Sequence, residues 1–175
     1  MSDTNDTFKI TPEDWAMRPL QSTDRYGLGI WLADGKLVGT DGHMLVARDK
    51  PNTPALPETW RLEFHHPAKL LRGETIEIPR ALGAHAIERG NGKIALVKVR
   101  DCGETPPDWR ALRTSWESPR GQQIGLNPRL VSQFAAMTCG ERGPLVIHPA
   151  ADSPLSPVTY TANGVFGLIM PQRID

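Results

Sequence analysis

The feature that most limits the fold of this chain is how often turn-forming residues interrupt its apolar segments. The pairs Asp34-Gly35 and Asn91-Gly92 each stand between two apolar or alternating runs. Such pairs favour tight hairpin turns between antiparallel strands. The chain carries 16 glycines and 16 prolines in 175 residues, so its elements must be short. Short strands joined by tight turns favour a sheet-rich protein over a helical bundle.

Three short helices are predicted between the strands. The segment Thr11-Pro12-Glu13-Asp14 has the pattern of a capped helix start, and Pro19 ends that helix early. Asn127-Pro128 repeats the start further along the chain, and Gly140 suits its end. A further one or two helical turns are expected over residues 66–71. The core-facing stripe of the helix that starts at Asn127-Pro128 is predicted to comprise Leu130, Val131, Phe134 and Met137.

The predicted elements repeat in the order strand, helix, strands. This order occurs three times at a spacing of roughly fifty residues, although the units share no obvious sequence identity. It predicts an α+β fold with short helices on antiparallel sheets. The predicted strands are 7–10, 26–32, 36–38, 44–47, 60–64, 75–78, 85–88, 93–100, 123–126, 145–148, 157–161 and 165–170.

Charge and cysteine content narrow the functional classes. Basic and acidic residues number 20 each, so the basic surplus typical of proteins that grip DNA through phosphates is missing. Cys102 and Cys139 form no CxxC pair and are expected to be reduced thiols in a cytoplasmic protein. Because the first residues are polar and acidic, we do not expect a signal peptide, and no apolar run is long enough to cross a membrane. We expect neither a cofactor nor a metal.

Two segments resemble the bacterial DNA sliding clamp, the beta subunit of DNA polymerase III. Residues 37–46, LVGTDGHMLV, resemble the family's "VATDGHRLA" turn, and residues 168–174, LIMPQRI, resemble its "VVMPMRL" tail. Three further pieces follow in the family's order: PDWR at 107–110, IGLN at 124–127 and DSPLSPV at 152–158. Each piece is weak alone, but five in order identify the chain as a shortened clamp-like protein.

The resemblance also implies a domain organisation. Residues 7–114 match the middle domain of a clamp subunit, and residues 121–175 match the last half of its third domain. The sequence departs from the family at several points. Met44 stands where the family has Arg, Gln172 stands where it has Met, and Asp175 extends past the usual end. No proline follows Leu112.

In the family, the turn and the tail line a hydrophobic groove that receives short linear motifs of polymerases and other replication or repair proteins. The resemblance therefore implies a non-catalytic protein that binds such motifs, as an accessory or a decoy. Apolar anchors within a polar rim also suit a small interface. The predicted groove comprises Thr40, Gly42, His43, Met44, Leu45, Leu168, Met170, Pro171, Gln172, Arg173 and Ile174.

Two alternatives remain open at this stage. The first is a DNA-encircling processivity factor built as a homo-oligomer, in which basic residues face duplex DNA. Its candidates are Arg18, Arg25, Lys69, Arg72, Arg129 and Arg142. The second is a small enzyme or metal-binding protein using Asp41 and His43, or His65 and His66. Adjacent residues in a strand point to opposite faces, and no known catalytic fingerprint occurs, so this alternative is the weaker.

Overall fold

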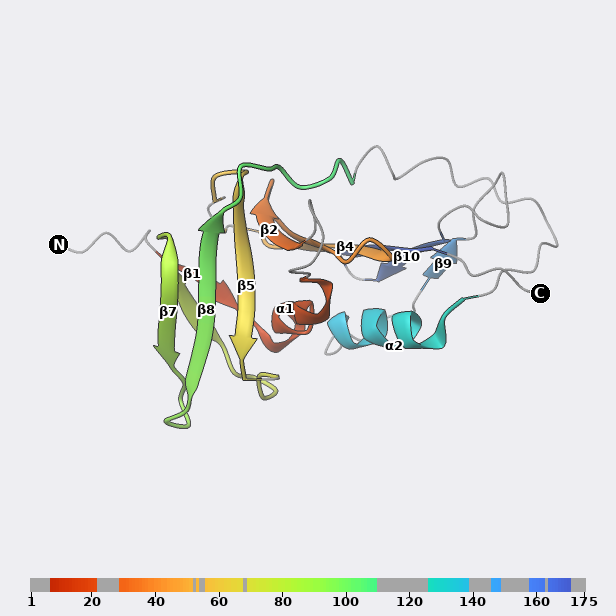
Figure 1. Ribbon diagram of the computed structural model, residues 1–175. Helices are drawn as coiled ribbons and strands as arrows, with labels where there is room; N and C mark the ends of the chain where they lie inside the picture. The colour runs from red at the N-terminus through yellow and green to blue at the C-terminus, as the bar shows by residue number, and fades with distance from the viewer. Residues whose placement is uncertain are drawn as a thin grey trace.

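The structure, a computed structural model, describes residues 7–21, 29–51, 53, 56–67, 69–109, 126–138, 146–148, 158–162 and 164–170. Figure 1 shows strands packed on two α-helices. The elements in chain order are β1 (Thr7–Ile10), α1 (Pro12–Trp15), the 3-10 helix η1 (Arg18–Leu20), β2 (Gly29–Ala33), β3 (Lys36–Thr40), β4 (Met44–Asp49), β5 (Trp60–His66), β6 (Ile76–Pro79), β7 (Gly83–Glu88), β8 (Ile94–Asp101), α2 (Pro128–Met137), β9 (Val146–His148), β10 (Val158–Ala162) and β11 (Val165–Ile169).

Nine of these strands form one antiparallel sheet in the order β7-β8-β5-β2-β3-β4-β11-β10-β9. Strands β1 and β6 form a separate antiparallel pair. The central junction joins β4 to β11, which lie far apart in the sequence, with Leu45 opposite Leu168 and Met44 opposite Ile169. The sheet therefore brings the first fifty residues into direct contact with the C-terminal strands.

Both α-helices lie on one face of strands β2, β4 and β10 (Figure 1), and they contact each other there. Thr11 caps α1 as the sequence predicts, because its side chain accepts from the backbone of Asp14 while the Asp14 carboxylate accepts from Thr11 N. Asn127 caps α2 through Arg129 N. In α2, Phe134 and Met137 are fully buried, and Leu130 and Val131 pack at the edge of the core.

The core between helices and sheet also explains two glycines in the strands. A Cβ added at Gly167 would overlap the ring of Phe134, and one at Gly39 would press on Met17 and Leu20. These strands approach the helices so closely that a side chain has no room. The helix-facing side of the sheet is thereby fixed at both β3 and β11.

The fold is α+β, as predicted, but the helical turns expected over residues 66–71 are wrong. His66 ends β5, and the described residues that follow it form bends and turns. Proline disfavours the helical region for the residue before it, so Pro67 opposes a helix starting at His66. The carbonyl of Pro67 instead accepts a hydrogen bond from the indole of Trp15 at 3.0 Å.

Where the other predicted strands fall on described residues, they agree with the structure to within a few residues. Residues 26–28, 145 and 157 of the predicted strands lie outside the described residues. Leu126 lies outside any strand, and residues 123–125 of that predicted strand lie outside the described residues, as does Gly140. In the described part of the chain, no helix is long and apolar enough to cross a membrane.

Candidate functional site

The turn between β3 and β4 is built by its own side chains. Asp41 Oδ1 accepts from His43 N at 2.9 Å and from Met44 N at 2.8 Å. Thr40 Oγ1 donates to the Met44 carbonyl at 2.9 Å and accepts from Gly42 N at 3.1 Å. Gly42 has a φ of 84°, which a side chain would oppose. The turn thus leaves Gly42 and His43 exposed at the end of the β3–β4 hairpin.

The C-terminal strand lies directly beside this turn. Met170 N donates to the His43 carbonyl at 3.0 Å, which continues the β4–β11 ladder past its last paired residues. The Met170 side chain is 44% exposed. The predicted contact between the turn and the start of the tail is therefore present. Pro171, Gln172, Arg173 and Ile174 lie outside the described residues.

Three of the predicted groove residues form one cross-strand row. Thr40 on β3 pairs with Leu45 on β4, and Leu45 pairs with Leu168 on β11. Directly opposed residues of an antiparallel sheet lie on the same face. All three side chains are buried, with 5–6% of their surface exposed.

This row belongs to the face of the sheet that points away from the helices, which we call the outer face. Alternation along β4 places Leu45 and Ala47 there, whereas Met44 and Val46 join the helix-side core. Met44 is 2% exposed. The structure therefore separates Met44 from Thr40, Leu45 and Leu168 by the thickness of the sheet.

The outer face carries a second, smaller hydrophobic cluster. We call it the outer-face cluster; it comprises Val38, Leu45, Ala47, Trp109, Phe166 and Leu168. Trp109 is its only member outside the strands. Its burial, at 6% exposure, makes Trp109 an anchor for the segment that follows β8. Phe166 was missed, although its alternation with Leu168 along β11 is the signal that could have found it.

A buried ionic network holds β4 against both helices. The Asp14 side chain of α1 is fully buried, with Oδ1 lying 3.1 Å from Arg48 Nε and Oδ2 lying 2.6 Å from Lys50 Nζ. Arg48 also donates to the Met137 carbonyl at the end of α2, at 2.9 Å. A cation at a helix C-terminus is stabilising, so Arg48 joins the two helices through one side chain. Sequence reasoning did not find this network.

Four of the six predicted DNA-facing residues lie in the part of the chain that the structure describes. Arg18 Nε donates to the Phe64 carbonyl at 2.9 Å, so this guanidinium serves the fold. Lys69 and Arg72 are exposed in the segment after β5, and Arg129 is exposed on α2. Arg25 and Arg142 lie outside the described residues.

Histidine builds no metal centre among the residues that the structure describes. Within the described ranges, no three His, Cys, Asp or Glu side chains come close enough to hold a metal. His65 Nε2 lies 3.2 Å from Glu63, and His66 is exposed at the end of β5. Burial raises the pKa of the Tyr160 phenol, which packs against Phe134 in the core.

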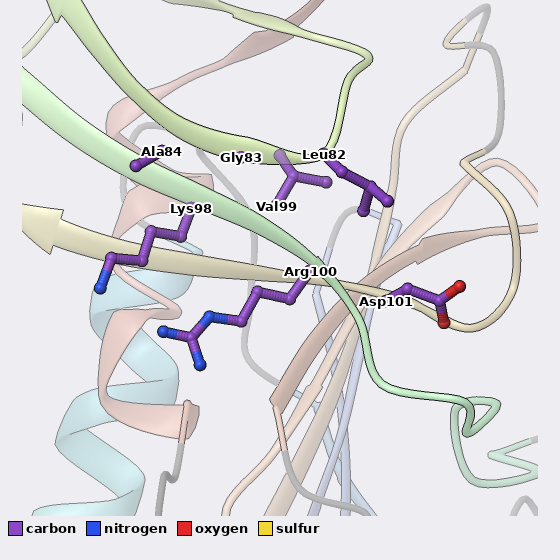
Figure 2. Close-up of a pocket in the computed structure, with 7 residues that line it drawn as sticks. All are labelled: Leu82, Gly83, Ala84, Lys98, Val99, Arg100 and Asp101. Carbon is purple, nitrogen blue, oxygen red and sulfur yellow. The ribbon is translucent and has the colours of Figure 1, made fainter.

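A hollow of about 460 Å³ lies at the far edge of the sheet. Figure 2 shows Leu82 and the start of β7 on one side of it, and Lys98 and Arg100 extending from β8. Its lining residues are Leu82, Gly83, Ala84, Lys98, Val99, Arg100 and Asp101. Three strands, β5, β2 and β3, separate β8 from β4, so this hollow is distinct from the outer-face cluster.

The fold matches solved structures of bacterial sliding clamps. DNA polymerase III subunit beta from Borrelia burgdorferi, solved with a natural product, matches at a TM-score of 0.53 and 10% identity, covering 100% of this chain and 66% of that one. The polymerase III beta protein of Caulobacter crescentus matches at 0.52 and 15% identity, covering 99% and 68%. The beta subunit from Thermotoga maritima matches at 0.51 and 12% identity, covering 99% and 67%.

The chain thus spans about two thirds of the length of these structures. No protein-family profile matches the sequence, and a search of curated proteins gave no match. The resemblance found in the motifs is confirmed at the level of the fold. With antiparallel sheet on one side, short helices on the other and the turn beside the final strand, this chain has the fold of the bacterial DNA polymerase III beta sliding clamps.

Proposed function

We propose that this chain is a non-catalytic, clamp-like protein that binds short peptide motifs of DNA replication or repair proteins. The binding site is the region where the β3–β4 turn meets the C-terminal strand. Its described residues are Thr40, Gly42, His43, Leu45, Leu168 and Met170. The proposal extends the site into the tail through Pro171, Gln172, Arg173 and Ile174.

The observation that carries this proposal is that the β3–β4 turn and the end of β11, far apart in the sequence, lie side by side. His43 and Met170 are joined by a backbone hydrogen bond of 3.0 Å, and Leu45 lies opposite Leu168. An exposed Met170 beside an apolar row offers the anchor for an apolar peptide side chain, and exposed His43 offers a polar rim. The likeness to sliding clamps supports a clamp-like or processivity role in general terms.

We also propose a domain organisation, a cellular location and a class of partner for this chain. Residues 7–114 act as one clamp-like domain and residues 121–175 as a half domain, in the cytoplasm. The partners are replication or repair proteins that carry clamp-binding motifs. We do not favour duplex DNA as a partner, because Arg18 is engaged by the Phe64 carbonyl and the chain's charges balance.

Titration of a fluorescent synthetic peptide carrying a clamp-binding motif tests the site. We expect saturable binding by the full chain and a roughly tenfold weaker affinity in Met170→Ala, the loss expected for removing one apolar anchor. Leu82→Ala is the matched control, because Leu82 is 50% exposed and lies at the other edge of the sheet. Absence of binding at about 1 mM peptide would end the proposal.

Leu45→Ala tests the buried part of the same row. Because Leu45 is 5% exposed, this variant requires a parallel unfolding curve to separate lost affinity from lost folding. We expect weaker binding in a protein that remains folded. Equal affinities in Leu45→Ala, Met170→Ala and the parent chain would place the peptide elsewhere.

A further inference from the structure

The side chain of Trp109 packs over the strand residues of the outer-face cluster. Trp109 lies on the connector that leaves β8 at Asp101, and Figure 1 shows this connector running over the side of the sheet away from the helices. Trp109 is 6% exposed, and it clusters with Leu45 and Leu168 from the proposed peptide site. A side chain from the connector therefore occupies the apolar surface that a peptide anchor would use.

The indole is held by contacts from two strands. Its ring centroid lies 6.1 Å from that of Phe166 on β11, with the planes tilted by 46°. Lys36 Nζ on β3 lies 5.3 Å from the indole centroid, which is within cation–π range. The backbone turns tightly here, since Trp109 N donates to the Pro107 carbonyl at 2.7 Å. Trp109 is thus docked on the strands rather than left in solvent.

We propose that Trp109 closes the peptide site in the free protein and must leave the outer-face cluster before a motif can dock. This inference rests on the proposed function and names its regulation. The occupant of the closed site is the indole of Trp109, which competes in cis with the peptide. Leu45 and Leu168 are only 5% and 6% exposed, so no ligand reaches them while the cover is in place.

The expected consequence follows from a closed and an open state. When only the open fraction binds, the apparent Kd equals the intrinsic Kd divided by that fraction. Removing the indole raises the open fraction and tightens binding. If Trp109 instead formed a wall of the site and touched the peptide, removing it would weaken binding. The two arrangements therefore predict opposite changes in peptide affinity for Trp109→Ala.

The experiment is the same peptide titration on the parent chain, Trp109→Ala and Trp60→Ala. We expect Trp109→Ala to bind about tenfold or more tightly, the change expected if roughly one molecule in ten or fewer is open in the parent chain. Trp60→Ala makes the same chemical change on β5, where Trp60 packs against the helix-side core, and it should leave affinity unchanged. Unchanged or weaker binding by Trp109→Ala overturns the inference.

Hydrogen exchange of the parent chain gives a second readout that needs no variant. On saturation with peptide, the amides of residues 104–109 should exchange faster, because the connector has left the sheet. Slower exchange there overturns the inference. If neither the parent chain nor Trp109→Ala binds, the proposed function itself fails. If the parent chain binds the peptide but Trp109→Ala does not bind it more tightly, only the closure by Trp109 is excluded, and the proposed function stands.

Discussion

Two regions of the nine-stranded sheet differ in how many of their faces are covered. In the central region, β3, β4 and β11, the helix-facing residues pack in the core beneath the helices, and the outer residues pack in the outer-face cluster. All five residues of β11 are buried. In the edge region, β5, β8 and β7, only alternate residues are buried, and β7 leaves four of its six residues exposed.

The difference shows why the candidate site lies where it does. A strand buried on both faces is held firmly and places its ends accurately, because packing and pairing oppose the same displacement. The β3–β4 turn and Met170 stand at the ends of such strands. The edge strand β7 has one neighbour, β8, among the described strands, and its surface is open. Substitutions should therefore cost much more in the central region than at the edge.

The largest expected effect is at Phe134. Phe134→Ala removes a fully buried ring that lies against Gly167 of β11, and it should lower the free energy of unfolding by about 4 kcal/mol. Ile87→Ala on β7, where Ile87 is only partly buried, should cost about 1 kcal/mol. Urea unfolding of both variants measures the contrast. Equal losses of unfolding free energy in the two variants would show that the central and edge regions contribute equally to stability.

The ionic network of the central region should give the next effect. Asp14→Asn leaves Arg48 and Lys50 without their buried carboxylate, and it should cost about 3 kcal/mol because unpaired buried charge is strongly destabilising. Glu13→Gln, one residue away and only partly buried, should stay within about 0.5 kcal/mol of the parent chain. A small loss in Asp14→Asn would mean that water replaces the carboxylate.

The edge region has its own ion pair, and its effect should be the smallest. The Arg89 guanidinium, which donates to both oxygens of Glu74, holds the pKa of that carboxyl below its ordinary value. A lowered folded-state pKa means that the pair stabilises the fold at neutral pH and loses this effect as pH falls through that pKa. Glu74→Gln should therefore be less stable than the parent chain at pH 7 and equal to it in strong acid. A difference that persists unchanged in acid would contradict this assignment.

Much of the local structure was predictable from neighbouring residues. The capping box at Thr11, the N-cap at Asn127 and the hairpin turn at Asp34-Gly35 depend on contacts within a few positions, and all are present. The helix predicted near His66 failed because a proline two positions into the segment outweighed a weak helical pattern. The juxtaposition of turn and tail was predicted from the motifs, whereas Phe166 and the Asp14 network were not.

The sequence by itself determined the short strands, the tight turns and the two capped helices, because those choices are made by propensity and by hydrogen bonds between near neighbours. Only the tertiary structure decided that β4 pairs with β11, that Met44 faces the core while Leu45 faces outward, and that Trp109 covers the outer face. A one-residue change of register would exchange the two faces of β4. When both faces of a strand are apolar, alternation cannot say which will meet the helices, and packing between distant segments makes that choice.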